Sequence, residues 1–357
     1  MKVLSDFGFE NKKVLMRCDF DVPLDEKGNI LDDFRIERSI PTIVYLTKKN
    51  AKLILMCHLK GFGDEIVSVA PIQKRLAEYL DCPVIKAKNC VGKEIEDWIS
   101  KMSPGDILLL ENLRFYAGEK ENDQEFARNL AKLGDIYIND AFATCHRKHA
   151  SIVGVPKYLP SAAGLVLMEE IRILSKIRKN PVRPLIAIMG GTVQEKKGLM
   201  FVEKMSQIAD FVLVGGLIKK SIEKEKFSFT SPQKIILPVK EAMSDFDLGP
   251  ETLKIFKEKI SQAKTIFWSG PVGKIEEERF SKGTMEIAQA IISASAFKVA
   301  GGGATIDFLR DHNLASKFNH LSTGGGSALA FLAGEKLPGI AALEEGEPRS
   351  VKLSGKP

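Results

Sequence analysis

Three consecutive glycines follow a short apolar run in the segment FKVAGGGATIDFL, residues 297–309, and a helical pattern follows them. A strand, a glycine turn and a helix in this order bring backbone N–H groups together at the positive end of a helix dipole, with no Cβ atoms in the way. The segment therefore predicts a phosphate site. A nucleotide normally arrives with Mg²⁺, which prefers a carboxylate ligand, but the residue after the glycines is Ala304.

Glycines also close other predicted strands between residues 184 and 326, in the segments MGG, VGG, WSGPVG and STGGG. One such turn is more often only a tight connection, but several in one domain favour a nucleotide crevice. Lys197 either reaches a phosphate or lies at the surface, and Glu276 either accepts hydrogen bonds from a ribose or belongs to an exposed acidic run. The predicted nucleotide-binding residues are Gly190, Gly191, Lys197, Gly215, Glu276, Gly301, Gly302, Gly303 and Thr305.

Charged residues, rather than glycines, follow the predicted strands of residues 1–160. Four cations lie at strand ends or in loops there: Arg35, His58, Arg114 and Arg147. Each alone is more often solvated or salt-bridged, but together on one rim they predict an anion clamp, because the arginine fork suits phosphate and carboxylate. Asp19 and Asp21 share one face of a strand, so they either hold a turn or an arginine, or bind a substrate hydroxyl.

Composition limits the class of protein. The chain has 357 residues, enough for two domains, with 44% hydrophobic and 27% charged residues and a net charge of +6. We expect no membrane span, because no apolar run reaches about 18 residues, and no signal peptide at the N-terminus. Five cysteines without a C-x-x-C pair predict reduced thiols and a cytoplasmic location. The mild positive charge fits an anionic small substrate. The sequence has no basic block interleaved with aromatic residues, so we expect no nucleic-acid partner.

Short apolar runs alternate with amphipathic stretches along most of the chain. Nearly continuous apolar strands are typical of parallel sheets covered on both faces, so the predicted fold is α/β with two Rossmann-like, doubly wound parallel-sheet domains joined by a hinge helix. Residues 1–163 form the first predicted domain, 164–182 the connecting helix and hinge, and 183–340 the second domain. Residues 341–357 are a predicted tail that packs back on the first domain.

Several segments resemble those of phosphoglycerate kinases, in the same order and over nearly the whole chain. They are MRCDFDVP, CHL, LLLENLRF, NDAFATCHRKHAS, LPSAAG, WSGPVG, FSKGT, GGGAT and HLSTGGGSALAFLAGEKLPGIAAL. ENLRF, NDAF with HR-HAS, and the STGGG…LPG block are specific to that family. The resemblance implies reversible phosphoryl transfer between 1,3-bisphosphoglycerate and ADP, giving 3-phosphoglycerate and ATP, with Mg²⁺ bound with ATP or ADP.

The resemblance also implies residue roles. The first domain would hold the glycerate and the second the nucleotide, with hinge closure between them and a monomeric state. The implied glycerate-binding residues are Asp19, Asp21, Arg35, His58, Arg114 and Arg147. The implied catalytic residues are Arg35, Lys197 and Gly325, and the implied phosphoryl-group region is Thr323, Gly324, Gly325 and Gly326.

The sequence departs from the family pattern in three places. Ala304 stands where the family carries its Mg²⁺-binding aspartate, Val193 replaces a lysine, and Gly61 stands where a loop arginine is expected. No protein metal ligand is therefore predicted. Two hypotheses follow: an active, divergent phosphoglycerate kinase, or a catalytically impaired relative that binds nucleotide or phosphoglycerate as a sensor or interaction module. A phosphosugar-binding protein of other specificity would explain the glycines but not ENLRF or STGGG…LPG.

Overall fold

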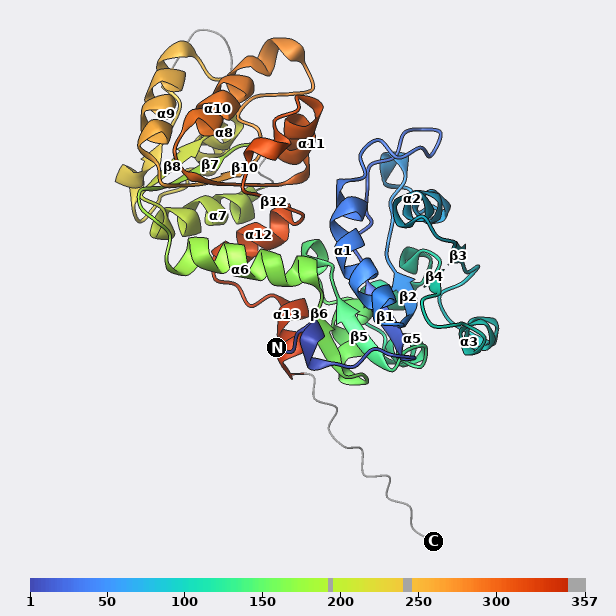
Figure 1. Ribbon diagram of the computed structural model, residues 1–357. Helices are drawn as coiled ribbons and strands as arrows, with labels where there is room; N and C mark the ends of the chain where they lie inside the picture. Colours follow the sequence, from blue (N-terminus) through green and yellow to red (C-terminus); the bar gives the residue numbers. More distant parts are fainter. Residues whose placement is uncertain (192–194, 240–245, 346–357) are drawn as a thin grey trace. The chain divides into compact units, whose positions relative to one another are not determined.

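The computed structural model describes residues 1–191, 195–239 and 246–345, with only the backbone described at 195–197. Contacts divide the chain into two compact units (Figure 1). Unit 1 contains Met1–Glu170 and the segment that begins at Lys336, and unit 2 contains Ile171–Glu335. Each unit has its own hydrophobic core around a six-stranded sheet.

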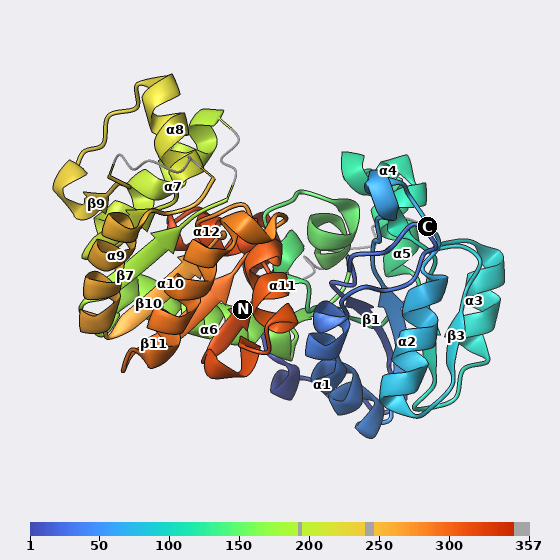
Figure 2. The same cartoon turned by 90° about the horizontal axis from the view of Figure 1, so that it is seen from above.

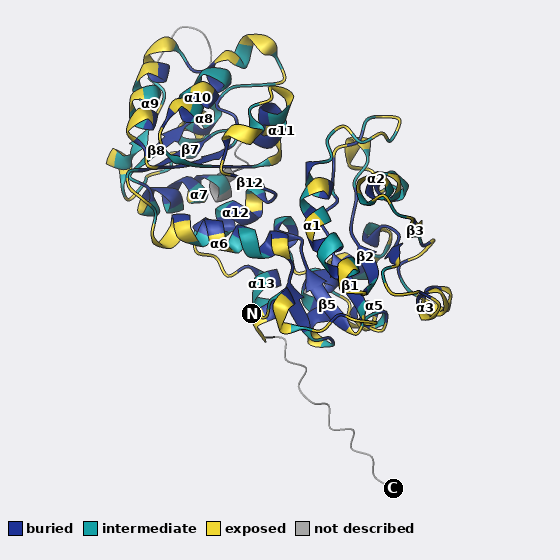
Figure 3. Ribbon diagram, viewed as in Figure 1, coloured by how far each residue is buried: buried dark blue, intermediate teal, exposed yellow. Residues whose placement is uncertain are grey.

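The sheet of unit 1 is parallel throughout, with the strand order β3-β4-β2-β1-β5-β6. Its strands are β1 (Lys13–Arg17), β2 (Lys52–Met56), β3 (Val84–Lys86), β4 (Ile107–Leu109), β5 (Ile136–Asn139) and β6 (Ser161–Ala163). The central strands are almost wholly buried (Figure 3). Their apolar residues therefore form continuous runs instead of alternating with polar ones.

Helices connect these strands and flank the sheet (Figure 2). They are α1 (Phe34–Lys48), α2 (Ala70–Leu80), α3 (Lys93–Ser100), α4 (Ala117–Glu121), α5 (Gln124–Ala131) and α13 (Pro338–Glu345), with one π-helical turn, η5 (Ala150–Gly154). The chain crosses from β1 to β2 in one direction and from β4 to β5 in the other. Because crossovers are right-handed, these connections place helices on opposite faces.

The sheet of unit 2 is also parallel, with the order β12-β11-β10-β7-β8-β9. Its strands are β7 (Leu185–Met189), β8 (Phe211–Val214), β9 (Ile235–Ile236), β10 (Thr265–Ser269), β11 (Phe297–Gly301) and β12 (His320–Ser322). Its helices are α7 (Glu195–Ile208), α8 (Gly216–Glu225), α9 (Pro250–Gln262), α10 (Lys282–Ser293), α11 (Gly303–Asp311) and α12 (Gly325–Leu332). The predicted α/β class, with two doubly wound parallel sheets, is confirmed.

Helix α6 (Leu165–Lys179) carries the chain from unit 1 into unit 2, and the division falls between Glu170 and Ile171. The chain returns to unit 1 at Lys336, earlier than the predicted limit at 340. Helix α13 contacts η5 and β6, and the amide of Gly339 donates to the Cys145 carbonyl at 2.9 Å. A Cβ at Gly339 would lie 2.8 Å from Ile152, so glycine permits this close packing.

The ends of β7 and β10 approach each other where the strand order of unit 2 reverses. Gly190 donates to the Ser269 carbonyl at 3.0 Å and Gly191 to the Pro271 carbonyl at 2.7 Å. A Cβ on Gly190 would lie 2.1 Å from the Pro271 carbonyl oxygen, and one on Gly270 equally close to the Gly190 oxygen. Both contacts are to backbone atoms, so relief would require the strand ends to separate.

We predict that Gly190→Ala lowers the thermal unfolding midpoint, because the new methyl group forces β7 and β10 apart. A loss of about 2 kcal/mol corresponds to roughly 4–8 °C for a unit of this size. Gly8→Ala is the matched control, since its added Cβ would meet no described atom within 4 Å. Circular dichroism melts of both variants test the prediction, and equal midpoints would contradict it.

Candidate functional site

The guanidinium of Arg17, at the end of β1, lies fully buried beneath the carboxyl edge of the first sheet. Its Nε donates to Ser151 Oγ at 3.0 Å, Nη1 donates to the Cys18 carbonyl, and Nη2 lies 2.9 Å from Nδ1 of His58. An arginine side chain has donors only, so His58 Nδ1 must accept. A neutral His58 ring therefore carries its hydrogen on Nε2.

His58 Nε2 faces Asp21 across the edge of the sheet, 3.4 Å from Oδ2. Burial lowers the pKa of His58 to about 4, so the ring is neutral at pH 7. Burial alone would raise the pKa of Asp21, but the interactions with His58 and Arg35 bring it down to about 2. The other oxygen of Asp21 accepts from the Lys60 amide at 3.0 Å. Asp21 is thus an ionised carboxylate held on two sides.

Arg35, in the first turn of α1, contacts both Asp21 and Asp19. Its Nη1 donates to the Asp21 carbonyl at 2.9 Å and lies 3.3 Å from Asp19 Oδ1. Asp19 is 3% exposed, and its Oδ2 is buried with no hydrogen-bond partner in the described part of the chain. A buried carboxylate oxygen without a donor is costly. A ligand hydroxyl would satisfy it.

Arg114 and Arg147 add positive charge to the same edge. Asn112 fixes the backbone before Arg114: its side-chain oxygen accepts from the Arg114 amide at 3.0 Å, and it is itself fully buried. Burial and then the charge of Arg147 lower the pKa of Arg114. Burial, followed by the charges of Arg114 and Arg147, lowers the pKa of His149 to about 3. Cations this close repel one another, so an anion between them would be stabilising.

The six residues that the sequence predicts for this site follow β1, β2, β4 and β5 or lie in the first turn of α1, at the carboxyl edge of the sheet of unit 1. Arg17, Ser151 and Glu119 were missed. Glu119 is fully buried and accepts from the amide and hydroxyl of Ser151, at 2.9 and 2.6 Å. The available signal was a charged residue inside the apolar run VLMRC, because such a residue must find partners when buried.

Glycines form the corresponding edge of unit 2. Helices α8, α11 and α12 begin after Gly215, Gly302 and Gly324, and glycine has no side chain with which to cap the first backbone N–H groups of a helix. Gly302 has φ +92°. A Cβ on Gly325 would lie 2.8 Å from the Cα of Gly302. Three helix N-termini thus present backbone N–H groups at one edge, which suits anionic phosphates.

A cavity of about 360 Å³ opens beside these turns in unit 2. It contains three positions that the sequence singled out, Gly191, Glu276 and Ala304, and its apolar lining residues are Leu217, Phe246, Pro271 and Ile275. A mainly apolar pocket beside exposed amides suits a flat ring that carries phosphates. Sequence reasoning missed Leu217, Phe246 and Ile275 as ligand neighbours because no motif surrounds them.

The remaining predicted positions of the second half follow β11 and β12 or lie in α7. Thr305 Oγ1 accepts from the Gly270 amide at 2.8 Å, which ties α11 to the end of β10. Thr323 is 4% exposed and precedes the turn into α12. Lys197 lies in α7, but its side chain is outside the described residues, as is the whole of Val193.

The residues described in unit 2 do not fit a metal ion held by protein ligands. Ala304 offers only a methyl group to the cavity. Across the described ranges, no three His, Cys, Asp or Glu side chains are grouped to hold a metal. None of the described helices has the length and apolar content needed to span a bilayer.

Comparison with known proteins identifies the family. The family model described as phosphoglycerate kinase matches residues 4–227 and 219–335. The chain belongs to the phosphoglycerate kinase family. It is 40% identical to the phosphoglycerate kinase of Dictyoglomus turgidum over 390 aligned residues, covering 96% of this chain and 98% of the relative. The relative from Coprothermobacter proteolyticus is 38% identical, with the same two coverages.

Solved structures agree. The phosphoglycerate kinase of Pyrococcus horikoshii matches with a TM-score of 0.87 and 29% identity, over 96% of this chain and 98% of that one. The enzyme of Coxiella burnetii matches with a TM-score of 0.79 and 32% identity, over 97% and 100%. The family match breaks into two pieces that overlap at 219–227, in and just after α8.

The depressed pKa of His58 predicts a pH dependence of stability. Between about pH 6.5 and 4 the unfolded state binds a proton at this residue and the folded state does not, so the free energy of unfolding falls as pH falls through this range. In His58→Gln, whose amide oxygen still accepts from Arg17, the decrease between pH 7 and pH 4.5 should be smaller by about 2 kcal/mol. Urea titrations at both pH values measure this, and parallel decreases in both proteins would contradict it.

Proposed function

We propose that this member of the phosphoglycerate kinase family catalyses reversible phosphoryl transfer between 1,3-bisphosphoglycerate and ADP, giving 3-phosphoglycerate and ATP. The observation that carries the proposal is the carboxyl edge of the sheet in unit 1, where Asp19 has an unsatisfied buried oxygen and contacts Arg35 through the other one, and where Arg114 and Arg147 add positive charge. A phosphoglycerate offers anionic groups to the cations and a hydroxyl to Asp19. The family match over the chain supports the same reaction.

In this proposal the charged residues of unit 1 hold the glycerate. Arg114 and Arg147 neutralise anionic oxygens, and Arg35 combines binding with charge neutralisation at the reacting end. Neutral His58 donates from Nε2, because Arg17 occupies Nδ1. Asp19 and Asp21 orient the hydroxyl region and keep Arg35 in place.

The nucleotide belongs to unit 2 in the same proposal. The first backbone amides of α8 and α11 face its phosphates, and Gly190, Gly191 and Gly215, whose own amides already donate to carbonyls at neighbouring strand ends, leave room for them. The cavity around Phe246 holds its base, and Glu276 accepts from its ribose. Lys197 and the turn from Thr323 to Gly326, including Gly325, bind the transferred phosphoryl group. Mg²⁺ supplies charge neutralisation when it arrives on the nucleotide, whose own phosphates bind it.

The chemistry explains why the site is cationic and lacks a strong general base. The attacking atom is already an anionic carboxylate or phosphate oxygen near pH 7, so no proton has to be removed first. Catalysis then rests on positioning, charge neutralisation and exclusion of water. We further propose that unit 1 acts as the glycerate domain and unit 2 as the nucleotide domain, about the segment 164–182, and that the protein works as a cytoplasmic monomer.

Arg35→Lys tests the proposed anion clamp. Lysine keeps the charge but loses the planar fork and its contact geometry with Asp21, so kcat/KM for 1,3-bisphosphoglycerate should fall by roughly 10²-fold. A coupled assay of ATP formation from ADP and enzymatically generated 1,3-bisphosphoglycerate measures this. The control is Arg128→Lys, on α5, whose guanidinium stacks over Tyr158. Absence of turnover in the wild type despite ADP binding would contradict the proposed reaction.

Ala304→Asp tests the unfilled carboxylate position. The variant places a carboxylate at the start of α11, facing the cavity, so the ADP-bound protein should bind Mg²⁺ about tenfold more tightly, equivalent to 1.4 kcal/mol. Calorimetric titration of Mg²⁺ into the ADP complex measures this without turnover. Ala333→Asp, at the end of α12, is a control for added charge. Unchanged Mg²⁺ affinity in Ala304→Asp would show that this helix start does not face the metal.

A further inference from the structure

Helix α1 joins the proposed anion clamp to the start of α6. Arg35 lies in its first turn, and Arg38 and Thr42 follow three and seven residues later, so the three side chains lie on neighbouring parts of one helix face. The Arg38 guanidinium forms an ion pair with Glu169 of α6. The hydroxyl of Thr42 accepts from the Leu165 amide at 3.2 Å.

The start of α6 is fixed to the sheet as well. Asp140, which directly follows β5, accepts from the amides of Val166 and Leu167 at 2.9 and 3.4 Å. Asp140 is 1% exposed, and a Cβ on the neighbouring Gly164 would lie 2.2 Å from its Oδ1. The first turn of α6 is therefore clasped between β5 on one side and α1 on the other.

The beginning of α1 has its own support from α2. Asp33 precedes the helix and accepts from the hydroxyl of Tyr79 at 2.9 Å, with Arg75 3.6 Å away. Helix α1 is thus also held in unit 1 by contacts other than the Arg38–Glu169 pair. The side chains are 30% and 38% exposed, and such pairs usually contribute only about 0–1 kcal/mol to stability.

Burial of the Arg38 Nε atom has a cost that the ion pair through Nη2 does not offset. Its Nε is buried and has no hydrogen-bond partner among residues 1–191, 195–239 and 246–345. A role in stability alone is therefore a poor explanation for the pair. Its location, one turn after Arg35 and at the start of the helix that leaves unit 1, favours a positioning role.

We infer that Arg38 and Glu169 are positioning residues that lock α1 to α6, so that anion binding at Arg35 and the order of the first turns of α6 are coupled. The inference rests on the proposed function, because the anion is the phosphoglycerate. Coupling of this kind is reciprocal. Breaking the pair should weaken anion binding, and anion binding should make the first turns of α6 harder to open.

Calorimetry with 3-phosphoglycerate tests the first consequence. Arg38→Ala and Glu169→Ala should each raise its Kd by roughly three- to tenfold, and the exchanged pair Arg38→Glu with Glu169→Arg should recover most of the loss. The Kd for ADP should stay the same in all variants. A purely structural role would lower the unfolding midpoint and leave the Kd for 3-phosphoglycerate unchanged.

Hydrogen exchange in the wild type tests the second consequence without any variant. Saturation with 3-phosphoglycerate should slow exchange in the peptide covering residues 165–171, and Arg38→Ala should reduce this protection. If the wild type binds 3-phosphoglycerate but exchange in this peptide does not change, the coupling is wrong. If the wild type does not bind 3-phosphoglycerate, the proposed function itself fails.

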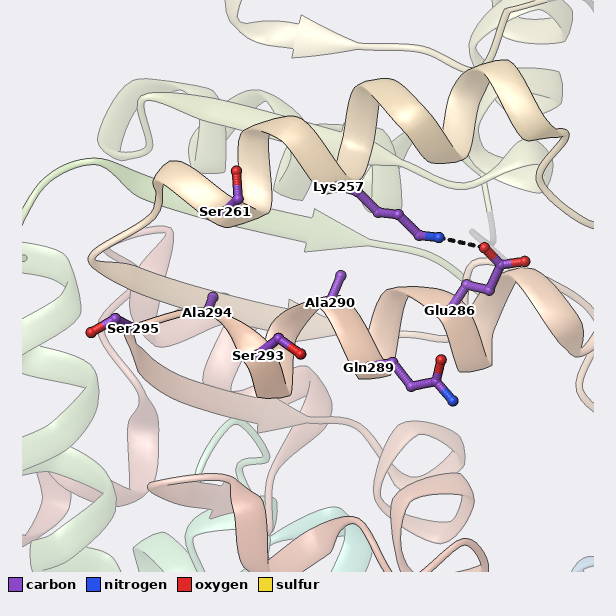
Figure 4. Close-up of a pocket in the computed structure, with 8 residues that line it drawn as sticks. All are labelled: Lys257, Ser261, Glu286, Gln289, Ala290, Ser293, Ala294 and Ser295. Carbon is purple, nitrogen blue, oxygen red and sulfur yellow. Dashed lines mark hydrogen bonds and ion pairs between the residues drawn. The ribbon is translucent and has the colours of Figure 1, made fainter.

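A second ion pair provides the matched control. Lys257 on α9 points at Glu286 on α10, beside a shallow pocket of unit 2, with Nζ 2.5 Å from Oε2 (Figure 4). Both side chains are 43% exposed, close to the values for Arg38 and Glu169. Lys257→Ala removes a half-exposed ion pair between two helices, and it should leave both 3-phosphoglycerate binding and the exchange of residues 165–171 unchanged.

Discussion

The buried guanidinium of Arg17 is the interaction on which the edge of the first sheet depends. A charged group without access to water must be fully partnered, and Arg17 takes its partners from three separate segments: Cys18, His58 and Ser151. Because it is a donor only, it decides which nitrogen of His58 remains for Asp21. Asp21 then holds the Lys60 amide and, through its carbonyl, Arg35. One buried charge thereby organises the polar groups of β1, β2 and α1.

The two units use the same sheet architecture for different chemistry. In unit 1 side chains converge at the carboxyl edge, which suits recognition of a small molecule by charge and shape. In unit 2 glycines allow strand ends to approach within contact distance and leave three helix starts open. Backbone amides bind phosphates whatever base is attached, so in the proposed function the apolar cavity is the part that recognises the base. The difference arises because the residues after the strands are charged in unit 1 and glycine in unit 2, at the carboxyl edges of two similar sheets.

Much of this arrangement could be predicted from the sequence because continuous apolar runs ending in polar residues or glycine place those residues at one edge of a parallel sheet. Strand β1 ends at Arg17, because the residues after it turn to bind neighbours. Strands β3 and β6 have three residues each, too few for a sequence pattern to show their period. Arg17 was missed as an organising group because His58 and Ser151, two of its partners, are distant in sequence. Phe246 was missed as a cavity-lining residue because no local sequence pattern marks a residue that lines a cavity. The earlier return of the chain to unit 1 depends on packing around Gly339, which no local propensity reveals.

The most direct measurement is ¹⁵N NMR of the His58 ring at pH 7, with and without 3-phosphoglycerate. The account predicts a neutral imidazole carrying its hydrogen on Nε2, since Arg17 donates to Nδ1, and a shift of the Nε2 resonance when the ligand saturates the site. A positively charged ring, a hydrogen on Nδ1, or resonances indifferent to the ligand would contradict it.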